Sequence, residues 1–190
     1  WKRNKQYLQE NFENIRKILI TDSRIGDWGF YDSLFAGGSC FIKDARSLSY
    51  QLKNKGGRTD LVDDCLAANQ RQLTNFLNRA KAEINFDWAD KTAALLGLAF
   101  KRDTNDIRNS AALEVAKFLL SAGVKKIKAY DPVAGNNFLK YFSGQAGADK
   151  IELAETESQA MLKAEILIIA GDWPQFRELD GLIKSNLPKG

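Results

Sequence analysis

The hydrophobic positions change their spacing along the chain, and the change predicts two kinds of structure. In the first half, apolar residues recur every three or four positions, which is the spacing of an amphipathic helix. This pattern predicts helices over residues 2–19, 43–52 and 60–84. From residue 92 onwards, short apolar runs alternate with helical patterns, which indicates strands as well as helices.

The helix predicted over 60–84 carries one continuous apolar stripe. Thr59 or Asp60 suits its N-cap, because a short polar side chain can accept a hydrogen bond from the first free N–H groups. A stripe of this length is typical of a core or a dimer interface rather than of a cofactor site. Asn69 lies on the stripe and needs a hydrogen-bonding partner if it is buried, and we assign it no further role. The stripe consists of Leu61, Val62, Cys65, Leu66, Asn69, Leu73, Phe76, Leu77, Ala80 and Ile84.

The second half of the chain predicts a Rossmann-like α/β domain. Successions of strand, helix and strand form right-handed parallel sheets, and ligands bind at the carboxyl ends of their strands. The turn after the first strand, residues 100–103, lacks the G-x-G-x-x-G pattern of dinucleotide sites. We expect strands at 92–100, 126–130 and 165–171, and helices at 110–122 and 157–163.

A polar segment, residues 85–90, separates the two patterns, and we place a domain boundary there. Residues 1–86 then form a helical domain and residues 87–190 the α/β domain. We expect the chain to stop before the strand that would complete the sheet.

The composition argues against several classes of function. The 190 residues are 44% hydrophobic and carry a net charge of +4, which suits a protein with a real core. The two cysteines, Cys40 and Cys65, have unlike neighbours and there is no histidine, so we expect neither a disulfide framework nor a metal site. No apolar run is long enough to span a membrane and no signal peptide is visible, so we expect no membrane association and a cytoplasmic location. The basic residues are spread along the chain without interleaved aromatics, which argues against a nucleic-acid partner.

Residues 35–44 hold the densest group of chemically reactive side chains. Cys40 follows Gly37 and Gly38, which allow a positive φ and a close approach of the backbone to a ligand. Lys43 and the start of the next helix would both favour a thiolate, the reactive form of cysteine. The alternative is that Cys40 is a small buried residue in a tight turn, which is common for free cysteines.

The same segment resembles the catalytic cysteine loop of the UDP-glucose/GDP-mannose dehydrogenase family, which commonly reads G-G-S-C-F-P-K-D. Residues 37–44 read G-G-S-C-F-I-K-D, so that Ile42 stands where the family usually has proline. Further segments that resemble the family follow the family's order: D-S-R-I-G at 22–26, L-G-L-A-F-K-R-D-T-N-D-I-R-N-S at 96–110, Y-D-P-V-A at 130–134 and D-W-P-Q-F-R-E-L-D at 172–180.

The resemblance implies a fold and an activity. The fold is a helical central segment, through which the protein would form a homodimer, followed by a Rossmann-like UDP-binding domain with a parallel sheet. The family oxidises the primary alcohol of a nucleotide sugar twice, with two molecules of NAD. A cysteine holds the aldehyde as a thiohemiacetal and then as a thioester, which water hydrolyses. A UDP-glucose substrate would give UDP-glucuronate.

The resemblance also implies roles for individual residues. Cys40 matches the covalent nucleophile, Lys43 would help to hold NAD and favour the thiolate, and Asp44 would orient or activate the hydrolytic water. Arg108 matches the arginine that reaches the diphosphate of NAD, and Asp106 would orient an arginine or cap the next helix. The positions that match substrate-binding residues of the family are Arg24, Ser33, Gly37, Phe100 and Lys101.

Several alternatives stay open. The family's NAD-binding domain has no counterpart in these residues, so we expect the chain to be the C-terminal part of such an enzyme and to be inactive alone. The sugar nucleotide could instead be GDP-mannose or a UDP-N-acetylhexosamine. The chain could also be a non-catalytic nucleotide-binding or dimerisation module in which Cys40 is idle. Lys101 and Arg108 would then be solvated surface charges, as most such residues are.

Overall fold

The computed structural model describes residues 13–27 and 34–186 of the chain. The chain divides into two compact units, residues 1–33 and 34–190. In the first unit residues 13–19 are helical, in agreement with the end of the helix predicted over 2–19. A turn follows, in which the N–H groups of Ile25 and Gly26 both donate to the carbonyl of Asp22 at 3.0 Å. The domain boundary at 85–90 stays a prediction.

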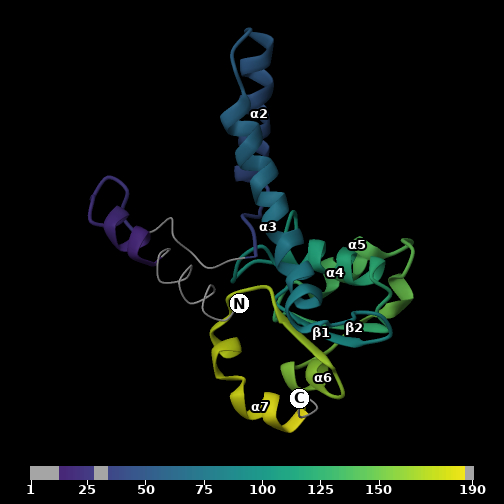
Figure 1. The fold of residues 1–190 in the computed structure, drawn as a ribbon. Helices are drawn as coiled ribbons and strands as arrows, with labels where there is room; N and C mark the ends of the chain where they lie inside the picture. Colours follow the sequence, from purple (N-terminus) through teal and green to yellow (C-terminus); the bar gives the residue numbers. More distant parts are fainter. Residues whose placement is uncertain (1–12, 28–33, 187–190) are drawn as a thin grey trace. The chain divides into compact units, whose positions relative to one another are not determined.

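The second unit contains a hairpin of two helices, α2 (Cys40–Asn54) and α3 (Asp60–Ile84), which lie side by side (Figure 1). The bounds of α3 are those predicted from the apolar stripe. Helix α2 begins earlier than predicted, at Cys40 rather than at Lys43. The thiol therefore lies in the first turn of the helix instead of before it.

Asp63 ties the two helices together near the turn that connects them, residues 55–59. Its carboxylate accepts hydrogen bonds from the hydroxyl groups of Ser49 at 2.6 Å and Thr59 at 2.8 Å, and pairs with Lys53 at 2.9 Å. The hydrogen bonds from Ser49, Lys53 and Thr59 lower the pKa of Asp63 to about 2. Thr59 directly precedes α3, as expected of an N-cap, but its hydroxyl donates to this carboxylate.

A four-stranded parallel sheet in the order β3-β2-β1-β4 forms the centre of the α/β part. Strand β1 ends at Leu96 rather than at residue 100, because Gly97 has a φ of +81° and turns the chain away. The short strand β3 was not predicted. The strands are β1 (Thr92–Leu96), β2 (Lys126–Tyr130), β3 (Ile151–Leu153) and β4 (Ile166–Ile169), and the helices are α4 (Ala111–Ser121), α5 (Gly135–Phe142), α6 (Glu157–Met161) and α7 (Asp180–Asn186), with 3₁₀ turns at Ala148–Lys150 and Pro174–Glu178.

Helices cover both faces of the sheet, and successive side chains of β1 enter different cores, as the pleat of a strand requires (Figure 1). Leu95 lies in the larger core with α4 and α5, and Leu96 lies in the smaller one with α6 and α7. The C-terminal half of α3 joins the larger core through Leu73 and Leu77, which are 3% and 2% exposed. The helical hairpin is thereby anchored to the sheet.

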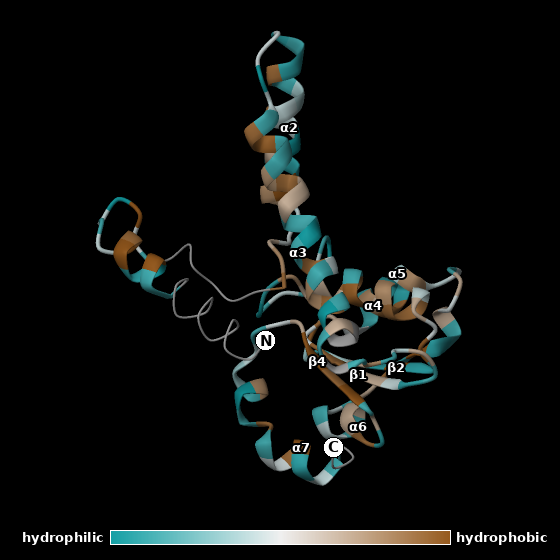
Figure 2. Ribbon diagram, viewed as in Figure 1, coloured by the Kyte–Doolittle hydropathy of each residue, from teal (hydrophilic) through white to brown (hydrophobic). Residues whose placement is uncertain are grey.

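The first half of the apolar stripe on α3 is not covered. Leu61 is 79% exposed, and Figure 2 shows hydrophobic stretches on the hairpin as well as along β4, which reads I-L-I-I. The predicted stripe thus divides into a buried part near the sheet and an exposed part near the tip. Within residues 13–27 and 34–186, no helix is both long and apolar enough to cross a membrane.

Candidate active site

The cysteine loop is compact because two glycines occupy positions that a side chain could not. Gly38 has a φ of +87°, and a Cβ on it would lie 3.0 Å from the ring of Phe100. A Cβ on Gly37 would lie only 2.4 Å from the backbone oxygen of Asn109. The loop therefore packs directly against the segment that follows β1.

Cys40 is the first residue of α2 and is exposed, so the expectation of a small buried cysteine in a tight turn is wrong. The Ser39 hydroxyl lies 3.9 Å from the Cys40 sulfur. The thiol therefore lies at a helix N-terminus, where the free N–H groups favour negative charge on a bound group.

Lys43 and Asp44 follow Cys40 by three and four residues on the same helix, so the three side chains share one helix face. The Lys43 ammonium lies 3.3 Å from the Asp44 carboxylate, and both side chains are about 70% exposed. An acid, a base and a nucleophile are thus available to a molecule bound at this face.

The loop after β1 presents an aromatic ring and a cation next to the cysteine loop. Phe100 contacts Gly38, and its N–H donates to the carbonyl of Asp106 at 3.0 Å, which closes the loop. The ammonium of Lys101 lies 5.4 Å from the centre of the Phe100 ring. Lys101 itself is exposed and available to an anion.

Arg108 provides a second cation near the thiol. Its guanidinium pairs with Asp106, with a shortest distance of 2.7 Å, so Asp106 orients an arginine as predicted. This hydrogen bond, together with the charges of Asp106 and of Cys40, raises the pKa of Arg108, while the same pairing lowers the pKa of Asp106. The helix cap is supplied by Ser110, whose hydroxyl accepts from the Leu113 N–H at 3.2 Å.

Asp131 organises the carboxyl ends of the strands, a role that the sequence did not reveal. One carboxylate oxygen accepts hydrogen bonds from the N–H groups of Leu98 at 2.7 Å and Ala99 at 3.2 Å and from the Trp173 indole at 3.2 Å. The other oxygen accepts from the N–H groups of Val133 at 2.9 Å and Ala134 at 2.8 Å. Its place in the Y-D-P motif was the available signal, but a sequence motif does not show what the carboxylate binds.

The predicted site residues do not all belong to one compact unit. Cys40, Gly37, Phe100 and Arg108 are gathered around the cysteine loop. Arg24 belongs to the first unit, where it pairs with Asp22 at 2.6 Å, and it is 88% exposed. Ser33 lies outside the described residues. Among the residues that the structure describes, no three His, Cys, Asp or Glu side chains are grouped in a way that could hold a metal ion.

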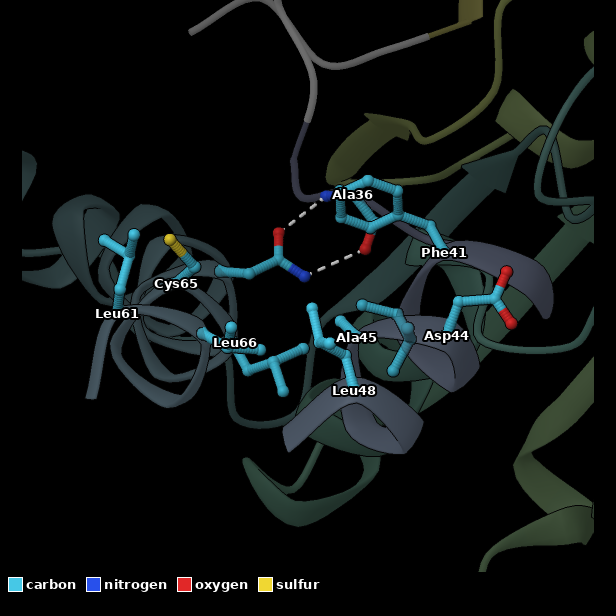
Figure 3. Close-up of a pocket in the computed structure, with 11 residues that line it drawn as sticks. Ala36, Phe41, Asp44, Ala45, Leu48, Leu61, Cys65 and Leu66 are labelled. Atoms are coloured by element: carbon cyan, nitrogen blue, oxygen red, sulfur yellow. Dashed lines mark hydrogen bonds between the residues drawn. The ribbon is translucent and has the colours of Figure 1, made fainter. Parts of the chain in front are cut away.

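An apolar groove of about 600 Å³ runs between α2 and α3 beside the cysteine loop (Figure 3). Leu48 and Leu66 line it from the two helices, and Asn69 and Ala36 close one end. Three of its large apolar side chains, Leu61, Phe41 and Leu48, are 79%, 69% and 49% exposed. Its lining residues are Ala36, Phe41, Ile42, Asp44, Ala45, Leu48, Leu61, Val62, Cys65, Leu66 and Asn69.

Comparison with known proteins decides the family. Residues 94–188 match the UDP binding domain of the UDP-glucose/GDP-mannose dehydrogenase family, and residues 4–71 match its central domain. The chain belongs to this family. The resemblance and the α/β fold inferred from the sequence are thereby confirmed.

Relatives within this dehydrogenase family are similar along most of the chain. The UDP-glucose 6-dehydrogenase of Pseudomonas aeruginosa is 31% identical over 90% of the chain, and that of Haloferax volcanii is 35% identical over 84%. The solved UDP-glucose dehydrogenase of Pyrobaculum islandicum superposes with a TM-score of 0.77 at 28% identity and covers 88% of the chain. The chain spans 37%, 35% and 37% of these three dehydrogenases, respectively.

Proposed function

We propose that the chain is the substrate-binding and nucleophile-bearing part of an NAD-dependent nucleotide-sugar 6-dehydrogenase that converts UDP-glucose to UDP-glucuronate. The observation that carries this proposal is the position of Cys40. The thiol is exposed at the start of α2, and its loop contacts Phe100 in the UDP binding domain. A sugar attached to a diphosphate at that loop would present its reacting carbon to the thiol.

The UDP part of the substrate would bind at the loop after β1. Ligands of open parallel sheets bind at the carboxyl ends of the strands, and this loop lies there. Lys101 would neutralise the diphosphate, and Phe100 would support the bound molecule through its ring. The backbone of Gly37 and Gly38 would line the sugar, and the substrate-binding roles that the resemblance implies for Arg24 and Ser33 stay predictions.

The chemical steps assigned to this chain centre on Cys40. Its thiolate would add to the carbonyl carbon of the sugar aldehyde, forming a C–S bond and an alkoxide that takes up a proton. After the second oxidation the product is a thioester, which loses the thiolate when water adds to the same carbon. Asp44, one helical turn beyond Cys40 and paired with the Lys43 ammonium at 3.3 Å, would accept the proton of that water.

NAD, when bound, supplies the hydride acceptor for both oxidations. The residues of this chain that would contact it are Lys43 and Arg108, both cationic and exposed. The Arg108 guanidinium, held by Asp106 beside the cysteine loop, suits a diphosphate group. The loop after β1 reads G-L-A-F-K and offers no dinucleotide fingerprint, so we assign no complete NAD site to this chain.

Titration calorimetry of this chain with UDP, UDP-glucose and GDP-mannose tests the substrate assignment. We expect UDP-glucose to bind at least about tenfold more tightly than GDP-mannose. Lys101→Ala should weaken that binding, and Lys140→Ala, which removes an exposed lysine of α5, should not. Tighter binding of GDP-mannose would favour the alternative sugar, and no binding of any of the three would contradict the proposal.

The chain alone should not turn over. Mixed with NAD and UDP-glucose, it should produce no NADH, because the family's NAD-binding domain is not part of these residues. Accumulation of NADH would refute this expectation. A full-length enzyme carrying Cys40→Ala that keeps full activity would favour the non-catalytic module instead.

We also propose that a second copy of the chain covers the apolar groove of the hairpin, giving a homodimer. Leu61 and Phe41, at 79% and 69% exposure, would become buried there, and burial of such side chains is the main driving force of association. Leu61→Glu should yield monomers by light scattering after gel filtration. Leu162→Glu, at an exposed leucine outside the groove, should leave the dimer intact. If both variants had the same molecular mass in solution, this interface would be contradicted.

A further inference from the structure

Asn69 holds the start of the cysteine loop by a paired amide contact. Its side-chain oxygen accepts from the N–H of Ala36 at 2.7 Å, and its side-chain nitrogen donates to the carbonyl of Ala36 at 2.9 Å. Both hydrogen bonds are drawn as dashed lines at Ala36 in Figure 3. Two hydrogen bonds to one residue fix the direction of the backbone as well as its position.

Asn109 holds the other end of the same short segment. Its backbone oxygen accepts from the Gly38 N–H at 3.2 Å, and its side-chain nitrogen donates to the Gly38 carbonyl at 3.1 Å. Asn109 has a φ of +50°, a conformation that asparagine tolerates better than most residues. This conformation directs its backbone oxygen toward the loop, where only the missing Cβ of Gly37 leaves room.

These four hydrogen bonds act on the backbone immediately before Cys40. Ser39, the N-cap of α2, accepts no capping hydrogen bond from the helix N–H groups through its side chain, whose hydroxyl instead lies 3.9 Å from the Cys40 sulfur. The first turn of α2 is therefore positioned by the loop that enters it rather than by a cap. A shift of Ala36 or Gly38 would move Cys40 away from the helix start and from the charge of Arg108.

We propose that Asn69 and Asn109 are positioning residues that hold Cys40 at the N-terminus of α2, beside the UDP-binding loop. The positioning of Cys40 matters for the reaction only if Cys40 is the nucleophile, as proposed above. Asn69 lies in the match to the central domain and Asn109 in the match to the UDP binding domain, so the loop is held jointly by both. A movement of either segment would therefore shift the backbone before Cys40 through the hydrogen bonds of Asn69 and Asn109.

Alkylation of Cys40 by iodoacetamide tests the proposal on this chain without any turnover. In a Cys65→Ser background Cys40 is the remaining thiol of the sequence. Asn69→Ala removes one amide pair. Asn109→Gly removes the other side chain while keeping the positive φ accessible, and gives a second, independent variant. Asn75→Ala, at an exposed asparagine of the same helix, is the matched control.

We expect both loop variants to react about threefold more slowly than the parent at about pH 7, because the reacting sulfur anion would no longer lie at the free N–H groups of the helix terminus. At about pH 10, where thiols are ionised anyway, all rates should converge. Asn75→Ala should match the parent at both pH values. A rate ratio of one at both pH values, or a ratio that does not depend on pH, overturns the proposal.

The result is independent of the proposed enzymatic function. If alkylation is unaffected by the two substitutions while UDP-glucose binding and the effect of Cys40→Ala are as expected, only the positioning role fails. If the variants slow alkylation but a full-length Cys40→Ala enzyme stays active, the positioning role stands and the nucleophile assignment fails.

Discussion

Removal of the Asp131 carboxylate should destabilise the chain strongly, because five N–H groups depend on it. Asp131 is 8% exposed, and Leu98, Ala99 and Ala134, three of its backbone partners, are at most 3% exposed. In Asp131→Ala these three buried donors lose their acceptor, and each such loss costs about 1 to 3 kcal/mol. Even at the lower limit the sum is about 3 kcal/mol, and we expect a loss of about 3 to 5 kcal/mol in the free energy of unfolding.

Chemical denaturation followed by fluorescence measures this loss. Asp131→Asn keeps one acceptor oxygen but places an amide N–H against the remaining donors, so we expect a loss of about 2 kcal/mol. Trp173→Phe removes the indole donor at 3.2 Å together with part of a buried ring, and should cost about 2 kcal/mol. If Asp131→Ala lost less than about 1 kcal/mol, water would be satisfying these donors and the reasoning from burial would be wrong.

Three further predictions follow from the loop, the hairpin and the candidate substrate site. Gly37→Ala would place a Cβ 2.4 Å from a backbone oxygen, so we expect a loss of about 1 to 3 kcal/mol in denaturation experiments, and an unchanged stability would show that the loop can shift freely. The pKa of Asp63 lies at about 2 in the folded chain, below the ordinary value of 3.8 for an aspartate, so its contribution to stability is present above about pH 4 and lost as the pH falls toward 2. Thermal unfolding between those pH values should therefore show a steeper loss for the parent than for Asp63→Asn, and parallel curves would contradict it. Lys101→Glu should abolish UDP binding by calorimetry while leaving the melting temperature unchanged, because Lys101 is exposed.

The hairpin shows what hydrophobic spacing can predict and what it cannot. Helix α3 has the predicted bounds, because its apolar stripe is long and its ends are marked by polar residues. The start of α2 was missed, since G-G-S-C carries no periodic pattern and the first turn is set by contacts with distant residues. Strand β1 was predicted too long because Leu98 and Ala99 are as apolar as the strand, although Gly97 already turns the chain.

The site was predictable to the extent that it rests on local motifs. Cys40, Lys43 and Asp44 could be found because they lie within one helical turn of each other. The contacts of Asn69 and Asn109 could not, because they join positions 33 and 71 residues away in the chain. Asparagine before a helix is a weak signal for a positive φ, and it does not reveal which carbonyl the side chain will reach.

Cys65 gives the hairpin a built-in attachment point for a probe. Its exposed sulfur belongs to the lining of the groove between α2 and α3, one helical turn from Asn69. With Cys40 changed to serine, a fluorophore or spin label attached to Cys65 would change its signal when a second molecule binds in the groove. The sequence thus already carries a labelling site from which the proposed dimer could be followed in real time.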